Sequence, residues 1–381
     1  MTSWPEAHRI AHGAGVPVAS VTVPLEGAAG RTLAADVASL HRLPHFDAAA
    51  MDGWAVRGPG PWRWVGQVLA GDPPPGELRD GEAVEIATGA VVPAGCEGVL
   101  PYEQGRVVGE GVEGPHPQGR HVRHAGEECG AGEVLLHKGS ALTAAALGLA
   151  AAVGHDHLPV RRDVRVRCLV TGSELVREGV PSAGQVRDAV GPLLRPALLA
   201  AGARLVEVQH LVDEAAVLKA ALADTAADPA PDLVVTSGAS SRGPADHLAR
   251  VLQDLGAQVL VDGVLVKPGH PQLLAVLPDG RPVVGLPGNP LAALCAVVTL
   301  VQPLVAGLLG RPCPEPVRGR LAEPVAGHPS SYRLVPVRLE DGKAVPTGHG
   351  GAAMLRGAAV ATHLAAVGPE GGSEVGLLAL P

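Results

Sequence analysis

The sequence predicts an α/β protein of several domains. We expect a doubly wound parallel sheet in a central domain, two smaller β-rich domains and an extended N-terminal segment. Two observations support this fold class. Strand-like and helix-like runs alternate between residues 161 and 310, the pattern of βαβ units. On both sides of that region, short β-like runs alternate with Gly and Pro, which is typical of small β-domains.

Shifts in this pattern predict the domain boundaries. The chain has 381 residues, enough for about two to four domains. We expect an extended linker domain from residues 1–43 and 131–160, and a β-rich domain from residues 44–130. Residues 161–310 should form the α/β domain, and residues 311–381 a C-terminal β-domain.

Composition excludes some classes of partner. The net charge of −8 argues against a nucleic-acid partner held by a basic surface, and the basic run "RRDVRVR" at 161–167 is interpreted as an edge strand. Residues 291–309 approach membrane-span length, but Thr299, Gln302 and Pro303 interrupt them, so we expect buried helices and no membrane. The N-terminus has no signal-peptide pattern, and the five cysteines show no CxxC pairing, which favours a cytoplasmic protein.

The motif "GLPGNP" at 285–290 predicts a strand, a rigid turn and a helix. Pro287 fixes its own φ and Gly288 permits unusual backbone angles. Asn289 suits an N-cap, and Pro290 suits the first helical position. The N-terminus of such a helix attracts anions, although the motif could also serve only as a helix cap.

Three polar loops follow apolar runs and should meet at the carboxyl edge of the sheet: residues 171–175, 236–246 and 286–290. Glu174, Asp188 and Asp246 bring carboxylates to this edge, and Lys267 brings a cation. Carboxylates beside anion-binding groups suit a divalent metal that bridges them to phosphate. Each acid alone could equally be a solvated helix-start residue. Neither common nucleotide-binding fingerprint is present.

Together these segments resemble the molybdopterin molybdenumtransferase family, the MoeA-type enzymes that include the C-terminal half of gephyrin. The resemblance extends in order over nearly the whole chain. It rests on "FDAAAMDGWAVRG", "IATGAVVPAGCEGVLPYE", "VRHAGEECGAGEVLLHKGSAL", "TGSEL", "GQVRDAV", "SGASSRGPAD", "VKPGHP" and "GLPGNP".

The resemblance implies an elongated four-domain homodimer whose active sites lie between the α/β domain of one subunit and the β-domain of the other. The implied activity is insertion of molybdate into adenylylated molybdopterin, with release of AMP and with Mg²⁺ as cofactor. The implied partners are a pterin-adenylating protein and molybdoenzyme-maturation proteins.

The resemblance also implies roles for individual residues. Asp188 and Asp246 would hold Mg²⁺, while Glu174 and Lys267 would act on the substrates, with Asp52 and Thr88 supplied by the partner subunit. The implied substrate-binding residues are Arg123, Glu128, Ser240, His270, Pro287, Gly288, Asn289 and Arg333.

Two departures from the family pattern affect the predicted molybdate site. His270 stands where the family usually has a Lys, and Ala292 where it usually has a Ser. An alternative function is therefore a non-catalytic pterin-binding or scaffolding paralogue with a degenerate molybdate site. A third is a nucleotide-binding hydrolase, which would release AMP without molybdate.

Overall fold

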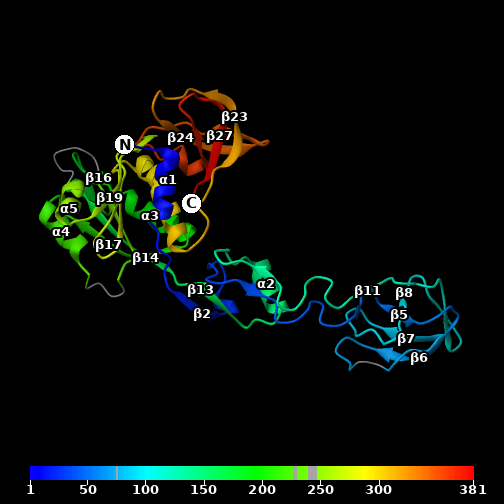
Figure 1. Ribbon diagram of the computed structural model, residues 1–381. Coiled ribbons are helices and arrows are strands. Elements are labelled where there is room, and N and C mark those ends of the chain that lie inside the picture. Colours follow the sequence, from blue (N-terminus) through cyan, green and yellow to red (C-terminus); the bar gives the residue numbers. More distant parts are fainter. Residues whose placement is uncertain (74–75, 226–229, 239–246) are drawn as a thin grey trace.

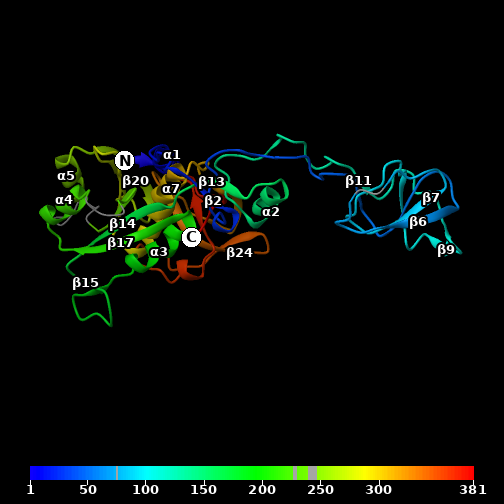
Figure 2. The same cartoon turned by 90° about the horizontal axis from the view of Figure 1, so that it is seen from below.

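The computed structural model describes residues 1–73, 76–225, 230–238 and 247–381 (Figure 1). The described chain is elongated. The α/β unit and the C-terminal unit lie together at one end, and the β-rich unit lies at the other, with a narrow linker between them (Figures 1 and 2). Each unit has its own hydrophobic core, and the α/β and C-terminal units share a further one.

The α/β unit is built on a six-stranded sheet. In spatial order its strands are β17 (Ala203–Leu211), β14 (Val164–Thr171), β18 (Leu233–Ser237), β22 (Pro282–Leu286), β21 (Leu273–Val276) and β19 (Gln258–Asp262). The first four are parallel, whereas β21 and β19 run antiparallel to their neighbours. The α/β class is confirmed, but the sheet is mixed rather than wholly parallel.

Helices cover both faces of this sheet because its strands alternate between two cores. Cys168 and Val170 face one core, and Leu169 faces the other. The first face packs against α1 (Trp4–Gly13), α3 (Val190–Ala201), α6 (Pro290–Ala296) and α7 (Gln302–Leu308). The second packs against α4 (Ala215–Ala223) and α5 (Leu248–Asp254).

The expectation that residues 161–167 form an edge strand is wrong. Strand β14 lies inside the sheet, paired with β17 on one side and β18 on the other. Its Arg167 side chain is only 5% exposed and forms ion pairs with Glu207 at 2.7 Å and Asp224 at 3.0 Å. Ion pairing rather than solvent therefore accommodates the basic residue within the strand.

Residues 290–308 form one long apolar helix with a π-helical segment at Val297–Val301 between α6 and α7. Its composition would suit a membrane span, but 94% of it is buried within the described protein. Thr299 has a structural role there, since its hydroxyl accepts a hydrogen bond from the Trp4 indole at 3.1 Å and donates to Cys295 O. This contact anchors α1 in the core.

A seven-stranded sheet forms the C-terminal unit and recruits two segments from elsewhere. Its order is β1 (Thr2–Ser3), β20 (Val264–Lys267), β24 (Tyr332–Glu340), β25 (Lys343–Pro346), β23 (Val317–Val325), β27 (Gly372–Ala379) and β26 (His363–Val367). Residues 2–13 therefore pack with the α/β and C-terminal units rather than with the linker. The extended run 258–267 is divided at Gly263 between two sheets.

The linker unit contains the pairs β2 (Ser20–Pro24) with β13 (His157–Arg161), and β3 (Val37–Ala38) with β12 (Val134–Leu136), beside α2 (Ala144–Ala152). The β-rich unit has a second six-stranded sheet. Its strands are β8 (Gly98–Pro101), β5 (Gly53–Val56), β7 (Glu82–Ile86), β6 (Trp62–Val68), β10 (Gly111–Glu113) and β9 (Arg106–Val108). A short pair, β4 (Ala48–Ala49) with β11 (Val122–Arg123), lies beside it.

Candidate functional site

The carboxyl ends of β14, β18 and β22 meet at one edge of the α/β sheet. The Thr171 hydroxyl donates to the carbonyl oxygen of Ser237 at 3.2 Å. Gly238 follows with φ +84, and a Cβ there would lie 2.6 Å from the Thr171 Oγ1. The Gly238 Cα is 3.9 Å from the position of a Cβ on Gly288. The three predicted loops therefore converge, as far as their described residues show.

The "GLPGNP" motif forms the expected local structure. Strand β22 ends at Leu286, Asn289 is the N-cap in an extended conformation, and α6 begins at Pro290. Gly288 and Asn289 are exposed, whereas Pro287 is buried. One early amide of the helix already has a partner, because Ala292 N donates to Ala352 O at 3.1 Å. That hydrogen bond attaches the C-terminal unit to α6.

Lys267 and His270 lie on a turn that packs directly on α6. A Cβ on Gly269, whose φ is +96, would lie 2.8 Å from Ala292 O. Buried Gln272 stabilises the turn by donating from Nε2 to Gly269 O at 2.7 Å. The turn therefore lies between the N-terminal end of α6 and the C-terminal sheet.

This turn and the C-terminal unit enclose a cavity of about 600 Å³. Its ionisable lining residues are Lys267, His270, His328 and Arg333, and no carboxylate of the described residues lines it. Lys267 and Arg333 are register partners on the parallel strands β20 and β24. Like charges opposite each other disfavour strand pairing, and a bound anion would remove that cost.

Asp188 lies near this sheet edge but is buried, with its side chain 7% exposed. Its Oδ1 accepts from the amides of Val190 and Gly191, both at 3.0 Å, at the start of α3. Its Oδ2 lies 3.2 Å from His210 Nε2. Glu174, by contrast, is exposed. Asp188 therefore acts as a helix cap, and lone pairs on its two oxygens are partly occupied.

The residues expected from the β-rich unit lie on loops and short strands of that unit. Asp52 Oδ1 accepts from the amide of Thr88 at 2.7 Å, and this hydrogen bond lowers the pKa of the Asp52 carboxyl. Arg123 pairs in register with Ala48 of β4. The backbone amide of Glu128 donates a hydrogen bond to Leu43 O, which fixes the position of its backbone. All four predicted side chains are exposed.

Two predicted residues, Ser240 and Asp246, lie outside the described residues. Among the described residues, no three His, Cys, Asp or Glu side chains gather as metal ligands would. His328 belongs to the cavity but was not predicted. It comes from an ordinary loop, "GHPSSYR", and only the pairing of β24 with β20 brings it near Lys267.

Fold and site define a multidomain α/β protein with a cavity lined by cationic side chains near the carboxyl edge of its α/β sheet. Comparison with known families agrees. Residues 2–154 match the MoeA N-terminal region (domain I and II), and residues 167–307 match a probable molybdopterin binding domain.

Characterised relatives extend this similarity over most of the chain. A molybdopterin molybdenumtransferase of Synechococcus elongatus is 35% identical over 83% of this chain and 81% of the relative. Molybdopterin molybdenumtransferase 2 of Mycobacterium tuberculosis is 36% identical over 77% and 76%. The solved structure of a molybdopterin biosynthesis MoeA protein from Pyrococcus horikoshii aligns with a TM-score of 0.80 at 29% identity, covering 100% of this chain and 99% of that one. The chain belongs to the molybdopterin molybdenumtransferase family.

Proposed function

We propose that this protein inserts molybdate into adenylylated molybdopterin and releases AMP, as an enzyme of molybdenum cofactor biosynthesis. The observation that carries the proposal is the strand register that sets Lys267 beside Arg333 in a cavity that no carboxylate of the described residues lines. Two fixed cations suit a dianion such as molybdate. The family membership supplies the reaction class, because relatives over most of the chain are named molybdenumtransferases.

The pterin and its phosphates would bind along the neighbouring sheet edge. The cavity turn contacts α6 at Ala292, and the loop before α6 contacts Gly238, which in turn contacts Thr171. This series of contacts connects the oxyanion cavity to the carboxyl ends of the strands. Molybdate in the cavity would therefore lie beside a pterin bound at the edge, where Glu174 is exposed.

Magnesium is proposed as the cofactor. Mg²⁺ is usually held by one or two carboxylates together with substrate phosphates, so a complete protein cage is not required. Asp188 would supply one such carboxylate, with the part of it that its hydrogen bonds to α3 and His210 leave for a metal. The ion would neutralise phosphate charge, and the pairing of Asp188 with Asp246 stays a prediction.

We further propose that the active protein is a homodimer in the cytoplasm. Within one chain, Asp52 and Thr88 lie in the β-rich unit at the opposite end of the molecule from the α/β unit (Figure 1). They could contribute to the same site as Lys267 only if a second subunit supplied them. A cytoplasmic location fits the five cysteines, none of which forms a disulfide.

The experiment is an AMP-release assay with purified protein and adenylylated molybdopterin, with and without molybdate. We expect AMP release that requires molybdate and Mg²⁺. AMP release at the same rate without molybdate would instead indicate a hydrolase. No release under any condition, with the substrate still bound, would indicate the non-catalytic, pterin-binding alternative.

A further inference from the structure

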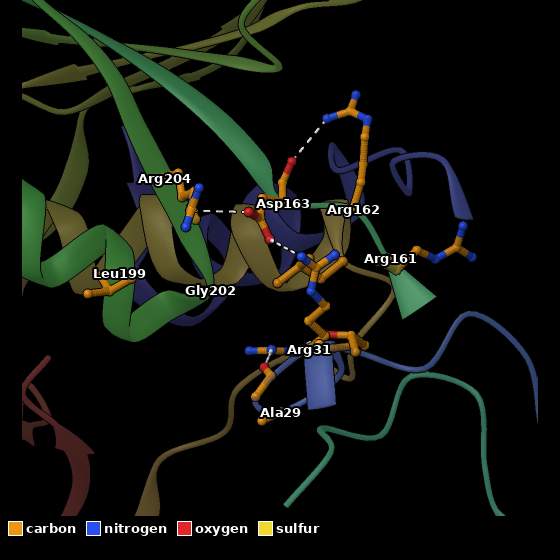
Figure 3. A pocket seen from close by; sticks show the side chains of 14 residues that line it. Ala29, Arg31, Arg161, Arg162, Asp163, Leu199, Gly202 and Arg204 are labelled. Carbon is orange, nitrogen blue, oxygen red and sulfur yellow. Dashed lines mark hydrogen bonds and ion pairs between the residues drawn. The ribbon is translucent and has the colours of Figure 1, made fainter. Parts of the chain in front are cut away.

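A second cationic cavity, of about 390 Å³, lies where the linker unit joins the α/β unit (Figure 3). It is bordered by the first residues of β17 and by Arg162 and Asp163, which directly precede β14, so it lies at the amino ends of those parallel strands. The candidate active site lies at their carboxyl ends. The second cavity and the sheet edge proposed for the pterin are therefore at opposite ends of these parallel strands. The charged residues that line the second one are Arg31, Arg161, Arg162, Asp163, Arg204 and Arg311.

Protein carboxylates neutralise only some of these five arginines. Asp163 lies between two of them, with Oδ2 3.1 Å from Arg204 Nε and Oδ1 4.0 Å from Arg31 (Figure 3). Arg162 forms two hydrogen bonds with Asp232, each 2.6 Å. Arg162 is therefore fully compensated, while Arg31 and Arg204 share one carboxylate.

Arg161 and Arg311 have no carboxylate partner among the described residues. Arg161 donates from Nη1 to the carbonyl of Val18. Its buried Nε forms no hydrogen bond with any residue that the structure describes. Burying such a donor without a partner is costly.

Arg311 uses neutral acceptors only. Its guanidinium donates to Thr32 Oγ1 at 2.7 Å, to Ala201 O at 3.3 Å and to Gly30 O at 3.4 Å. Burial lowers the pKa of this guanidinium, in agreement with a cation that lacks a nearby negative charge. Arg311 thus joins the linker to the α/β unit, and no carboxylate of the described residues neutralises its positive charge.

We propose that this cavity binds a small phosphorylated metabolite, whose phosphate groups Arg311, Arg161 and the shared pair Arg31 and Arg204 would contact. Guanidinium groups match phosphate oxygens with paired hydrogen bonds, which favours Arg-rich sites for phosphate. The volume lies within the range of pockets for small ligands. A site of this size, in a chain with net charge −8, does not suit a nucleic acid.

The ligand would bridge two units of the protein. Arg31 and Thr32 belong to the linker, whereas Arg204 belongs to β17 of the α/β sheet. Binding would add contacts across this junction. The proposal does not depend on the transferase reaction, because binding can be measured without either of its substrates.

The test is calorimetric titration of the full-length protein with inorganic pyrophosphate, and separately with AMP as a nucleotide form of the same chemistry. We expect Arg311→Gln and Arg204→Gln each to weaken pyrophosphate binding by roughly ten- to a hundredfold. Arg320→Gln is the matched control, because Arg320 is 70% exposed and lies outside the cavity, whereas Arg204 is 71% exposed. The control should bind like the wild type.

Weaker binding in Arg204→Gln would not result from misfolding, because so exposed a side chain contributes little to the core. Lys267→Gln reports on the other cationic cavity and should leave this binding unchanged. The proposal is overturned if pyrophosphate and AMP do not bind at millimolar concentration. It is equally overturned if Lys267→Gln abolishes binding while both arginine variants retain it.

Discussion

Lys267 and Arg333 are register partners on two neighbouring parallel strands, although they are remote in sequence. They line one cavity together with two histidines, His270 and His328. The pairing depends on β20, a strand that leaves the α/β unit and joins the C-terminal sheet. The geometry of the proposed molybdate site is therefore set by how two units share a sheet.

Replacing His270 with Lys should improve the use of molybdate at neutral pH. A lysine ammonium carries a positive charge at neutral pH and donates charge-assisted hydrogen bonds to an oxyanion. We expect His270→Lys to lower the half-saturating molybdate concentration at pH 7.5 by up to roughly tenfold. His137→Lys, on an exposed linker residue, is the control, and an equal improvement in that variant would contradict the prediction.

The contribution of Asp52 to the rate of AMP release should not change with pH across the neutral range. The hydrogen bond from the Thr88 amide lowers the pKa of the Asp52 carboxyl, so this group stays ionised well below neutral pH. Any stability that it contributes is present above its unfolded-state pKa and is lost only as the pH falls through the lowered value. We expect the ratio of wild-type to Asp52→Asn AMP-release rates to be constant from about pH 6 to 8. A ratio that changes over this range would contradict the assignment.

Gly191 should be required for the cap that Asp188 forms on α3. A Cβ at residue 191 would lie 2.6 Å from Asp188 Oδ2 and would displace the carboxylate. Gly191→Ala should lower the free energy of unfolding by roughly 0.5–2 kcal/mol, the usual effect of losing a cap. Urea denaturation measures this change.

Gly148→Ala in α2 is the matched control for that measurement, since a Cβ there meets nothing within 4 Å. It should stabilise the protein by up to about 1 kcal/mol, because alanine favours helix more than glycine does. If both variants changed stability in the same direction and by the same amount, the capping role would be wrong.

Subunit mixing should test the shared active site. At a molybdate concentration that half-saturates the wild type, Asp52→Asn and Lys267→Gln should each release AMP far more slowly than the wild type, because each would damage both sites of a symmetric dimer. In a mixed dimer, one site would carry both changes and the other neither. An equal, randomised mixture should recover about a quarter of wild-type activity. Mixed dimers without activity, although each variant folds and dimerises, would refute the exchange of residues between subunits.

The sequence predicted those features that depend on neighbouring residues. The turn from β22 into α6 was predictable because Pro287, Asn289 and Pro290 each restrict the local backbone. The convergence of the strand ends at Thr171, Ser237 and Gly288 followed from the topology of parallel strands.

Features that depend on long-range pairing were not predictable in this way. Periodicity indicates that residues 258–267 form extended chain, but it contains no information about the two different sheets that they join. The position of α1 in the shared core depends on the contact of Trp4 with Thr299. These two residues are 295 positions apart in the sequence. His328 was missed for the same reason.

The most direct test of the proposed site is the molybdate dependence of AMP release in Lys267→Gln. Loss of one charge-assisted contact should raise the half-saturating molybdate concentration by roughly ten- to a hundredfold. Lys343→Gln, at an exposed lysine of β25 outside the cavity, should behave like the wild type. If the two variants show the same molybdate dependence, the cavity between Lys267 and Arg333 is not the molybdate site.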